Sequence, residues 1–97
     1  MELEIGKHLV LSTVHVHCTT AEILDAWALL SPNDRPLTIA ATTYGWFIPT
    51  RELEGPLLAG IPSELPPILA FARRHDCTHV LFDCDGPRIS DLLEFPW

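Results

Sequence analysis

The sequence contains few positively charged residues, and this shortage disfavours partners that carry negative charge. Thirteen acidic residues stand against six basic ones, which gives a formal net charge of −7 at pH 7. The basic residues are Lys7, Arg35, Arg51, Arg73, Arg74 and Arg88. Neutralising phosphates requires several cations on one face, and an acidic protein is repelled from anionic lipid, so direct binding to nucleic acid or membrane is disfavoured. A protein with a basic surface is the partner that this charge favours.

Long apolar runs are also missing. None approaches the roughly 18–20 residues that span a bilayer, so we expect no transmembrane helix. The first residues, Met1 to Glu4, are acidic where a signal peptide is basic, and we therefore expect a cytoplasmic protein. With 97 residues and 47% hydrophobic content, residues 1–97 are expected to form a single domain around one core.

Motifs of common enzymes are absent as well. The sequence has no Gly-x-Ser-x-Gly elbow, phosphate loop or dinucleotide fingerprint. Its three cysteines, Cys18, Cys77 and Cys84, form no Cys-x-x-Cys unit, and reduced thiols are expected. Each lies in or beside an apolar stretch, where a thiol stays protonated and inert unless a cation is near. We therefore expect neither enzymatic activity nor a cofactor.

Runs of β-branched and apolar residues predict four strands. They cover residues 8–16, 37–43, 45–49 and 78–83. The second and third are close enough to form a hairpin, with Tyr44-Gly45 in or beside its turn. Residues 51–62 contain Gly55-Pro56 and Gly60 and are expected to form an irregular loop. Residues 89–95 are expected to form a short helical turn or strand.

Two helices are predicted between these strands. The first covers residues 19–30, where Thr19 and Glu22 have the spacing of a capping box. The second follows Ser63 as its N-cap and carries Pro66 and Pro67 in its first turn, where missing amides cost least. The apolar stripes expected to face the core are Ile23, Ala26, Trp27 and Leu30 on the first helix, and Leu65, Ile68, Leu69 and Ala72 on the second.

The resulting order is β-α-β-β-α-β with a short C-terminal extension. This order predicts an α+β fold, specifically a ferredoxin-like two-layer sandwich. In that topology two helices cover one face of a four-stranded antiparallel sheet. The first and last core strands are then antiparallel neighbours. Three-layer arrangements and other strand orders use the same elements and stay open.

The segment from Val80 to Pro87 resembles the first motif of haloacid-dehalogenase-type phosphatases. That resemblance implies a nucleophile at Asp83 and an acid/base at Asp85. However, only ten residues follow Pro87, none of them is a lysine, and Pro87 stands where the motif has threonine. A nucleophile without metal ligands or charge neutralisation gives little rate. We favour a structural interpretation in which Asp83 ends a strand and Asp85-Gly86 forms a turn, the glycine accepting a positive φ.

Histidines and cysteines suggest a second candidate site. If the first and last strands pair antiparallel, His15 or His17 approaches Cys77 or His79, and these four residues are weak candidates for a tetrahedral metal site. No pair has zinc-finger spacing, and small buried cysteines are ordinary core residues. We therefore predict no bound metal and keep this site as the alternative.

The residues that suggest protein binding are aromatic and acidic. The aromatic candidates are Tyr44, Trp46 and Trp97, because tryptophan and tyrosine anchor interfaces. Residues 76–97 hold five carboxylates against one arginine, which suggests partial mimicry of a nucleic acid. The acidic candidates for an interaction are Asp83, Asp85, Asp91 and Glu94. A homodimer is also compatible with the sequence, since an edge strand can pair across a two-fold axis.

The blocks Tyr44 to Phe47 and Phe82 to Pro87, with Trp97, are similar to those of a small bacterial family of unknown function found on plasmids and integrative elements. This resemblance implies an accessory role in plasmid maintenance, antitoxin action or counter-defence. We therefore predict a non-enzymatic acidic binding module of a mobile element. It is expected to inhibit a host defence system such as CRISPR-Cas by occupying a basic protein surface of a host or phage-related protein. The alternative is a metal-binding or vestigial phosphatase-like hydrolase that uses Asp83 and Asp85 together with the His/Cys groups.

Overall fold

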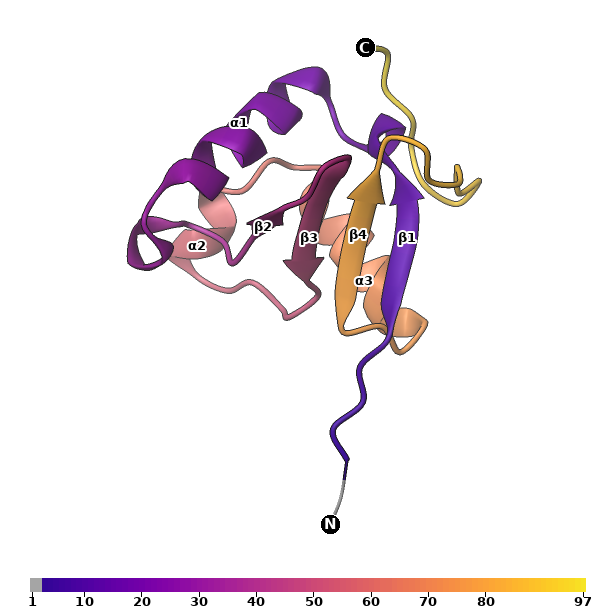
Figure 1. The fold of residues 1–97 in the computed structure, drawn as a ribbon, viewed down its shortest axis with the longest axis horizontal. Helices are drawn as coiled ribbons and strands as arrows, with labels where there is room; N and C mark the ends of the chain where they lie inside the picture. The colour runs from indigo at the N-terminus through magenta and orange to yellow at the C-terminus, as the bar shows by residue number, and fades with distance from the viewer. Residues whose placement is uncertain (1–2) are drawn as a thin grey trace.

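The computed structural model describes residues 3–97, apart from the side chain of residue 57, and it is a mixed α+β structure (Figure 1). Short 3₁₀ turns cover Thr13–His15 and Pro32–Asp34. The helices and strands in chain order are β1 (His8–Ser12), α1 (Cys18–Leu29), β2 (Ala40–Ala41), β3 (Gly45–Pro49), α2 (Pro56–Ala59), α3 (Leu65–Arg74) and β4 (His79–Asp83). No helix among the described residues is long and apolar enough to cross a membrane.

The four strands form one sheet in the order β1-β4-β3-β2. The predicted hairpin is confirmed, because β2 and β3 pair antiparallel, as do β3 and β4. The ferredoxin-like arrangement is not confirmed. Strands β1 and β4 are neighbours, but they run parallel, with His8 opposite His79 and Ser12 opposite Asp83. The expected direction of this pairing is therefore wrong, and the strand order differs as well, because β4 lies between β1 and β3 where a ferredoxin-like sheet has its first strand.

The reversal comes from the segment between β3 and α3. Arg73, near the end of α3, donates to the carbonyl of Thr50, which directly follows β3. Glu64, just before α3, accepts from the backbone N–H of His17, beyond the far end of β1. Residues 51–64 therefore cross the length of the sheet before α3 begins, so that α3 and then β4 run opposite to the predicted directions. The expected irregular loop contains the single helical turn α2.

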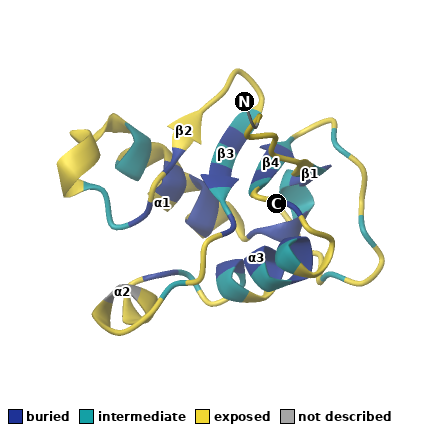
Figure 2. Cartoon of the chain, turned by 90° about the horizontal axis from the view of Figure 1, so that it is seen from below, coloured by how far each residue is buried: buried dark blue, intermediate teal, exposed yellow. Residues whose placement is uncertain are grey.

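The hydrophobic core lies on one face of the sheet. Trp46, Ile48, Val80 and Phe82 alternate inward on β3 and β4, and they belong to one core cluster with residues of α1 and α3. In Figure 2 the buried residues, in dark blue, lie on β3, β4 and α3. All four residues of the predicted α3 stripe are buried. Glu64 rather than Ser63 is the N-cap, and Pro66 and Pro67 lie in the first turn, as expected.

Helix α1 differs from its prediction in both start and phase. It begins at Cys18 with His17 as N-cap, so the proposed capping box at Thr19 and Glu22 is not used. Its buried residues are Thr20, Ala21 and Leu24. Trp27 is half-buried, whereas the other stripe residues Ile23, Ala26 and Leu30 are exposed. Because apolar residues surround much of this helix, periodicity alone does not determine which side meets the sheet.

Two predicted strands are shorter than expected, and the C-terminal segment is irregular. Strand β1 ends at Ser12, because the Ser12 hydroxyl accepts the N–H of Val14 and starts a 3₁₀ turn. Strand β2 keeps only two residues of the predicted range 37–43. Residues 87–97, which we call the C-terminal tail, form neither a helix nor a strand. The tail contains one turn, closed by the Leu92 N–H on the carbonyl of Ile89.

Candidate functional site

Charge is separated along the strand direction. The carboxylates that end β4 or follow it lie where β1 and β4 finish, and we call this region the acidic end: Asp83, Asp85, Asp91 and Glu94. One cation, Arg88, occurs in residues 83–97, and it pairs with Glu94 at 3.5 Å. Four cations lie before β1, after β3 or at the end of α3, all at the opposite end of the sheet: Lys7, Arg51, Arg73 and Arg74. The same segments also hold the carboxylates of Glu4, Glu52 and Asp76, so net negative charge is concentrated at the acidic end and the opposite end carries mixed charge.

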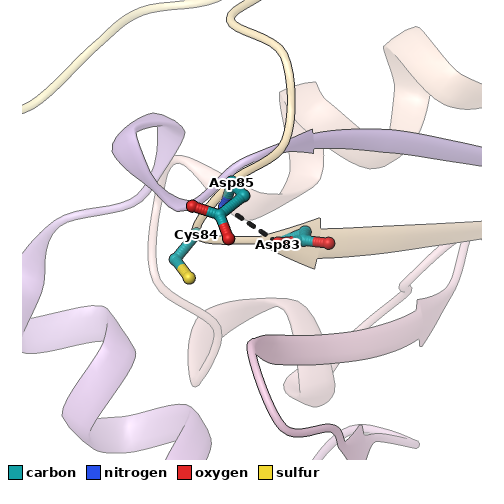
Figure 3. Close-up of side chains that lie close together, drawn as sticks. All are labelled: Asp83, Cys84 and Asp85. Carbon is teal, nitrogen blue, oxygen red and sulfur yellow. Dashed lines mark hydrogen bonds between the residues drawn. The ribbon is translucent and has the colours of Figure 1, made fainter.

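Asp83, Cys84 and Asp85 form a tight turn at the acidic end (Figure 3). One potential ligand atom from each lies within 4.8 Å of the others. The backbone N–H of Asp85 donates to Asp83 Oδ1 at 2.8 Å, so this carboxylate also holds the turn. Gly86 is needed for a different reason than predicted, since it has no positive φ. A Cβ there would lie 2.8 Å from the carbonyl of Leu11, so only glycine lets the turn approach β1 this closely.

This turn has part of the geometry of a phosphatase site. Ser12 ends β1 directly beside Asp83, and because the strands are parallel, a hydroxyl and a carboxylate leave the same edge of the sheet. The sequence did not indicate this neighbour, because the predicted pairing of the two strands was antiparallel. The Ser12 hydroxyl is engaged by the N–H of Val14, and the one lysine of the sequence, Lys7, precedes β1 at the opposite end. Nothing at this turn provides the lysine that such a mechanism needs to neutralise phosphate.

The parallel register also separates the two halves of the predicted metal site. His79 lies opposite His8 at the start of β1, whereas His15 and His17 follow the end of that strand. Cys77 is buried. The ring of His79 stacks on Phe47 at 4.7 Å, and its Nδ1 lies 2.9 Å from the hydroxyl of Thr78. The sheet does not bring these four candidate ligands together.

His15 instead anchors the C-terminal tail. Its side chain is fully buried, with Nδ1 2.7 Å from the carbonyl of Leu93 and Nε2 2.9 Å from the N–H of Ile89. This pattern requires a neutral ring that donates through Nδ1 and accepts through Nε2. His17 stacks on Phe95 with ring centres 3.8 Å apart. Both histidines therefore act on the tail, a role that no local sequence signal indicates.

Glu64 connects the start of α3 to the start of α1. Its Oε2 accepts the backbone N–H of His17 at 2.8 Å and the hydroxyl of Thr20 at 2.7 Å. Burial acts to raise the pKa of Glu64, but these hydrogen bonds outweigh it, and the pKa is lowered from its ordinary value. The carboxylate borders a cavity of about 300 Å³ beneath the tail, together with His17 and Asp91.

Two exposed aromatic residues border a groove at the acidic end. Tyr44 is 59% exposed and Trp97 is 64% exposed. Two hollows, of about 230 and 370 Å³, share Thr13, Cys84 and Trp97, and Tyr44 lines the smaller one. We call these hollows together the aromatic groove. Trp46, also a predicted interaction residue, is buried and donates from Nε1 to Asp25 at 2.9 Å, so it forms the base of the groove.

A known family model matches most of this chain. Residues 8–97 match the model described as the C-terminal domain of a family of unknown function, DUF5983. The chain belongs to this family. The match runs from the first residue of β1 to Trp97, so the DUF5983 domain includes the sheet, the acidic turn and the tail. Neither the curated proteins nor the solved structures provide a significant match.

Proposed function

We propose that this DUF5983 domain is a non-enzymatic protein-binding module whose binding surface is the acidic end. The observation that carries the proposal is the aromatic groove, where Tyr44 and Trp97 are both more than half exposed. Large aromatic side chains lose little conformational entropy on binding and bury much area, so they commonly dominate binding energy. Their location beside Cys84 and the acidic turn supports an interface that combines apolar anchors with negative charge.

The charge distribution supports a basic partner. The four carboxylates of the acidic end attract a positively charged surface, whereas the opposite end, where cations and carboxylates are mixed, attracts it less. Such an arrangement orients a partner during approach and increases the association rate more than the final affinity. Association is therefore expected to weaken as salt rises, because screening shortens the range of the attraction.

We further propose that the partner is a host protein whose basic surface normally binds nucleic acid. The row of carboxylates at Asp83, Asp85, Asp91 and Glu94 would occupy that surface as a partial mimic of phosphates. A component of a defence system such as CRISPR-Cas fits this description, and the domain would then be an accessory protein of a mobile element. The cytoplasm is the compartment where such a partner would be met.

A capture experiment with matched variants tests the proposal. Tagged protein, Trp97→Ala and Tyr44→Ala are incubated with native host lysate, and captured proteins are quantified by mass spectrometry. Leu29→Ala is the control, because Leu29 is an exposed apolar residue on α1, away from the groove. A partner bound by the native chain and the control, and reduced about tenfold or more for Trp97→Ala, supports the proposal. A partner retained equally by all variants would show that the groove is not the interface.

Binding of a divalent cation at the Asp83 to Asp85 turn is the second candidate function. The closeness of its three ligand atoms favours it, and carboxylate oxygens suit hard cations whereas a thiolate favours zinc. Titration with Mg²⁺, Mn²⁺ and Zn²⁺, followed by calorimetry, compares the native chain with Asp85→Asn. Saturable binding that Asp85→Asn abolishes supports a metal centre, and less than about 0.1 metal per chain in elemental analysis excludes one. Phosphatase turnover that depends on Asp83 would establish the hydrolase form of this alternative.

A further inference from the structure

The first strand leaves one side of its backbone unpaired. The Lys7 carbonyl accepts the N–H groups of Thr78 and His79, so Lys7 and, by alternation, Leu9 direct their backbone groups toward β4. Ser12 directs its N–H the opposite way, to the carbonyl of Pro87. The backbone groups of His8 and Val10 therefore also point away from β4. Within residues 3–97 no strand pairs with that side of β1.

An extended segment continues directly from this strand. Residues 3–7, which we call the N-terminal arm, leave the sheet along the line of β1 (Figure 1). Leu3 is 76% exposed and Ile5 is 80% exposed. They alternate with Glu4 and Gly6, which is the pattern of a strand with one apolar side. Open strand edges are normally covered or interrupted, because they recruit other strands.

We propose that two copies of this chain pair through the arm and β1, antiparallel across a two-fold axis. Each arm then lies beside the free edge of the other copy's β1, so the two sheets become one continuous sheet. About six backbone hydrogen bonds form in place of the unpaired edge groups. Ser12 ends the free edge of β1, because its outward N–H is already bound within its own chain.

The side chains select one register for this pairing. Keeping the helices of both copies on one side of the joined sheet requires the axis to pass through one residue, and centres on Gly6, Lys7 or His8 place the arm beside β1. A centre on His8 would place Glu4 opposite Ser12, whose outward N–H is already bound. A centre on Lys7 places two lysines directly opposite each other, which is unfavourable. A centre on Gly6 places Glu4 opposite His8 of the second copy, and Leu3 opposite Leu9. A centre on Lys7 also pairs apolar residues, Ile5 with Leu9, so the repulsion between the two lysines is what favours Gly6 on the axis.

This dimer leaves the proposed binding surface free. The arm precedes β1, whereas the acidic end lies beyond the opposite end of that strand. Antiparallel pairing directs the two acidic ends away from each other, so a dimer would present two aromatic grooves to separate partners. The dimer and the proposed function are therefore independent, and either can fail alone.

Sedimentation equilibrium of the full chain between about 10 µM and 1 mM tests the dimer. The weight-average mass is expected to rise from 10.8 kDa toward twice that value. Glu4→Pro removes an N–H that the pairing uses, and it is expected to raise the dissociation constant at least about tenfold. Ile5→Pro is the matched control, because the N–H of Ile5 points to the other side of the arm, and it is expected to change the constant by less than about threefold.

Each other outcome contradicts the proposal. A monomer at every concentration shows that the edge does not pair. Equal weakening by both proline variants shows that the contact does not follow the alternation of a strand. Growth beyond a dimer shows a different interface. Both substitutions lie in the exposed arm, outside the core cluster, so circular dichroism should show an unchanged fold in every sample.

Discussion

The two terminal segments differ in what fixes them. The N-terminal arm (residues 3–7) and the C-terminal tail (residues 87–97) both lack regular structure, and both carry exposed apolar side chains. Residues 3–6 make no hydrogen bond to the rest of the described chain. The tail makes a series of them with residues 12–16, and their tail members are Pro87, Ile89, Leu93, Phe95 and Trp97. Apolar content therefore does not decide which segment is held, but backbone partners do.

One buried side chain provides the central part of that attachment. His15 accepts a hydrogen bond from the N–H of Ile89 and donates one to the carbonyl of Leu93. It lies in the 3₁₀ turn that follows β1 and that Ser12 caps. In the arm the hydrogen bonds are confined to Lys7, where it joins β1, and residues 3–6 have no such partner among the described residues. A segment without helix or strand can thus be fixed by a polar group whose hydrogen bonds are all satisfied.

The largest expected effect is therefore the loss of His15. His15→Leu keeps a similar apolar volume but leaves the Ile89 N–H and the Leu93 carbonyl without partners. We expect a loss of about 3 kcal/mol in the free energy of unfolding, and a fall in melting temperature of roughly 10–25 °C. Denaturant unfolding and calorimetry measure both. Amide exchange at Ile89 and Phe95 should accelerate to the rate of the arm.

His17→Leu is the control for this prediction. His17 is exposed, and its ring contacts the tail through the stacking on Phe95. We expect it to cost less than about 1 kcal/mol. Equal losses for the two variants would mean that the tail is not held by the buried hydrogen bonds of His15, and the contrast with the arm would then need another cause.

Glu64→Gln tests the support beneath the tail, with an intermediate effect. Glutamine keeps the shape of the side chain but loses the charge that strengthens the bonds to His17 and Thr20. We expect a loss of about 1 kcal/mol at pH 7. Because folding lowers the pKa of Glu64, its contribution is present above the ordinary value of 4.5 and is lost as pH falls through the folded pKa.

The difference in unfolding free energy between the native chain and Glu64→Gln should therefore be constant above about pH 5.5 and shrink in more acidic solution. Denaturant unfolding at several pH values measures it. A difference that stays the same down to pH 3 would show that the charge of Glu64 does not stabilise the fold.

Trp97→Phe tests the end of the tail, and its effect should be smaller. Phenylalanine keeps an aromatic ring but cannot donate to the Val16 carbonyl, a bond of 3.0 Å in the native chain. Because Trp97 is mostly exposed, we expect a loss of roughly 0.5 kcal/mol, with faster amide exchange confined to residues near Phe95. A loss as large as that of His15→Leu would place the main attachment at the terminus instead.

The sequence predicted those features that depend on neighbouring residues. The β2–β3 hairpin, the buried stripe of α3 and the position of β4 all follow from short-range patterns, and all are present. The direction of β4 was wrong, because it depends on how residues 51–64 cross the sheet. That path is fixed by contacts such as Arg73 to Thr50, which no local pattern reveals.

The candidate site shows the same division. Tyr44, Trp46 and Trp97 were all candidates for an interaction surface; Tyr44 and Trp97 are exposed, whereas Trp46 alternates inward on β3 and is buried. The role of His15 was missed because its partners lie more than 70 positions away in the sequence. Ser12 was missed beside Asp83 because that neighbour depends on the parallel register.

The smallest expected effect on stability is in the arm. Ile5→Ser removes an exposed side chain without backbone partners, so the free energy of unfolding of dilute protein should change by less than about 0.5 kcal/mol. The same variant at about 1 mM should show a lower weight-average mass than the native chain, because the side chain of Ile5 lies diagonally beside Ile5 and Leu9 of the second copy and these apolar contacts are lost. Chemical denaturation at about 5 µM and sedimentation at about 1 mM separate the two effects. A clear loss of stability in dilute protein would show that the arm packs on its own chain, and the arm would then resemble the tail.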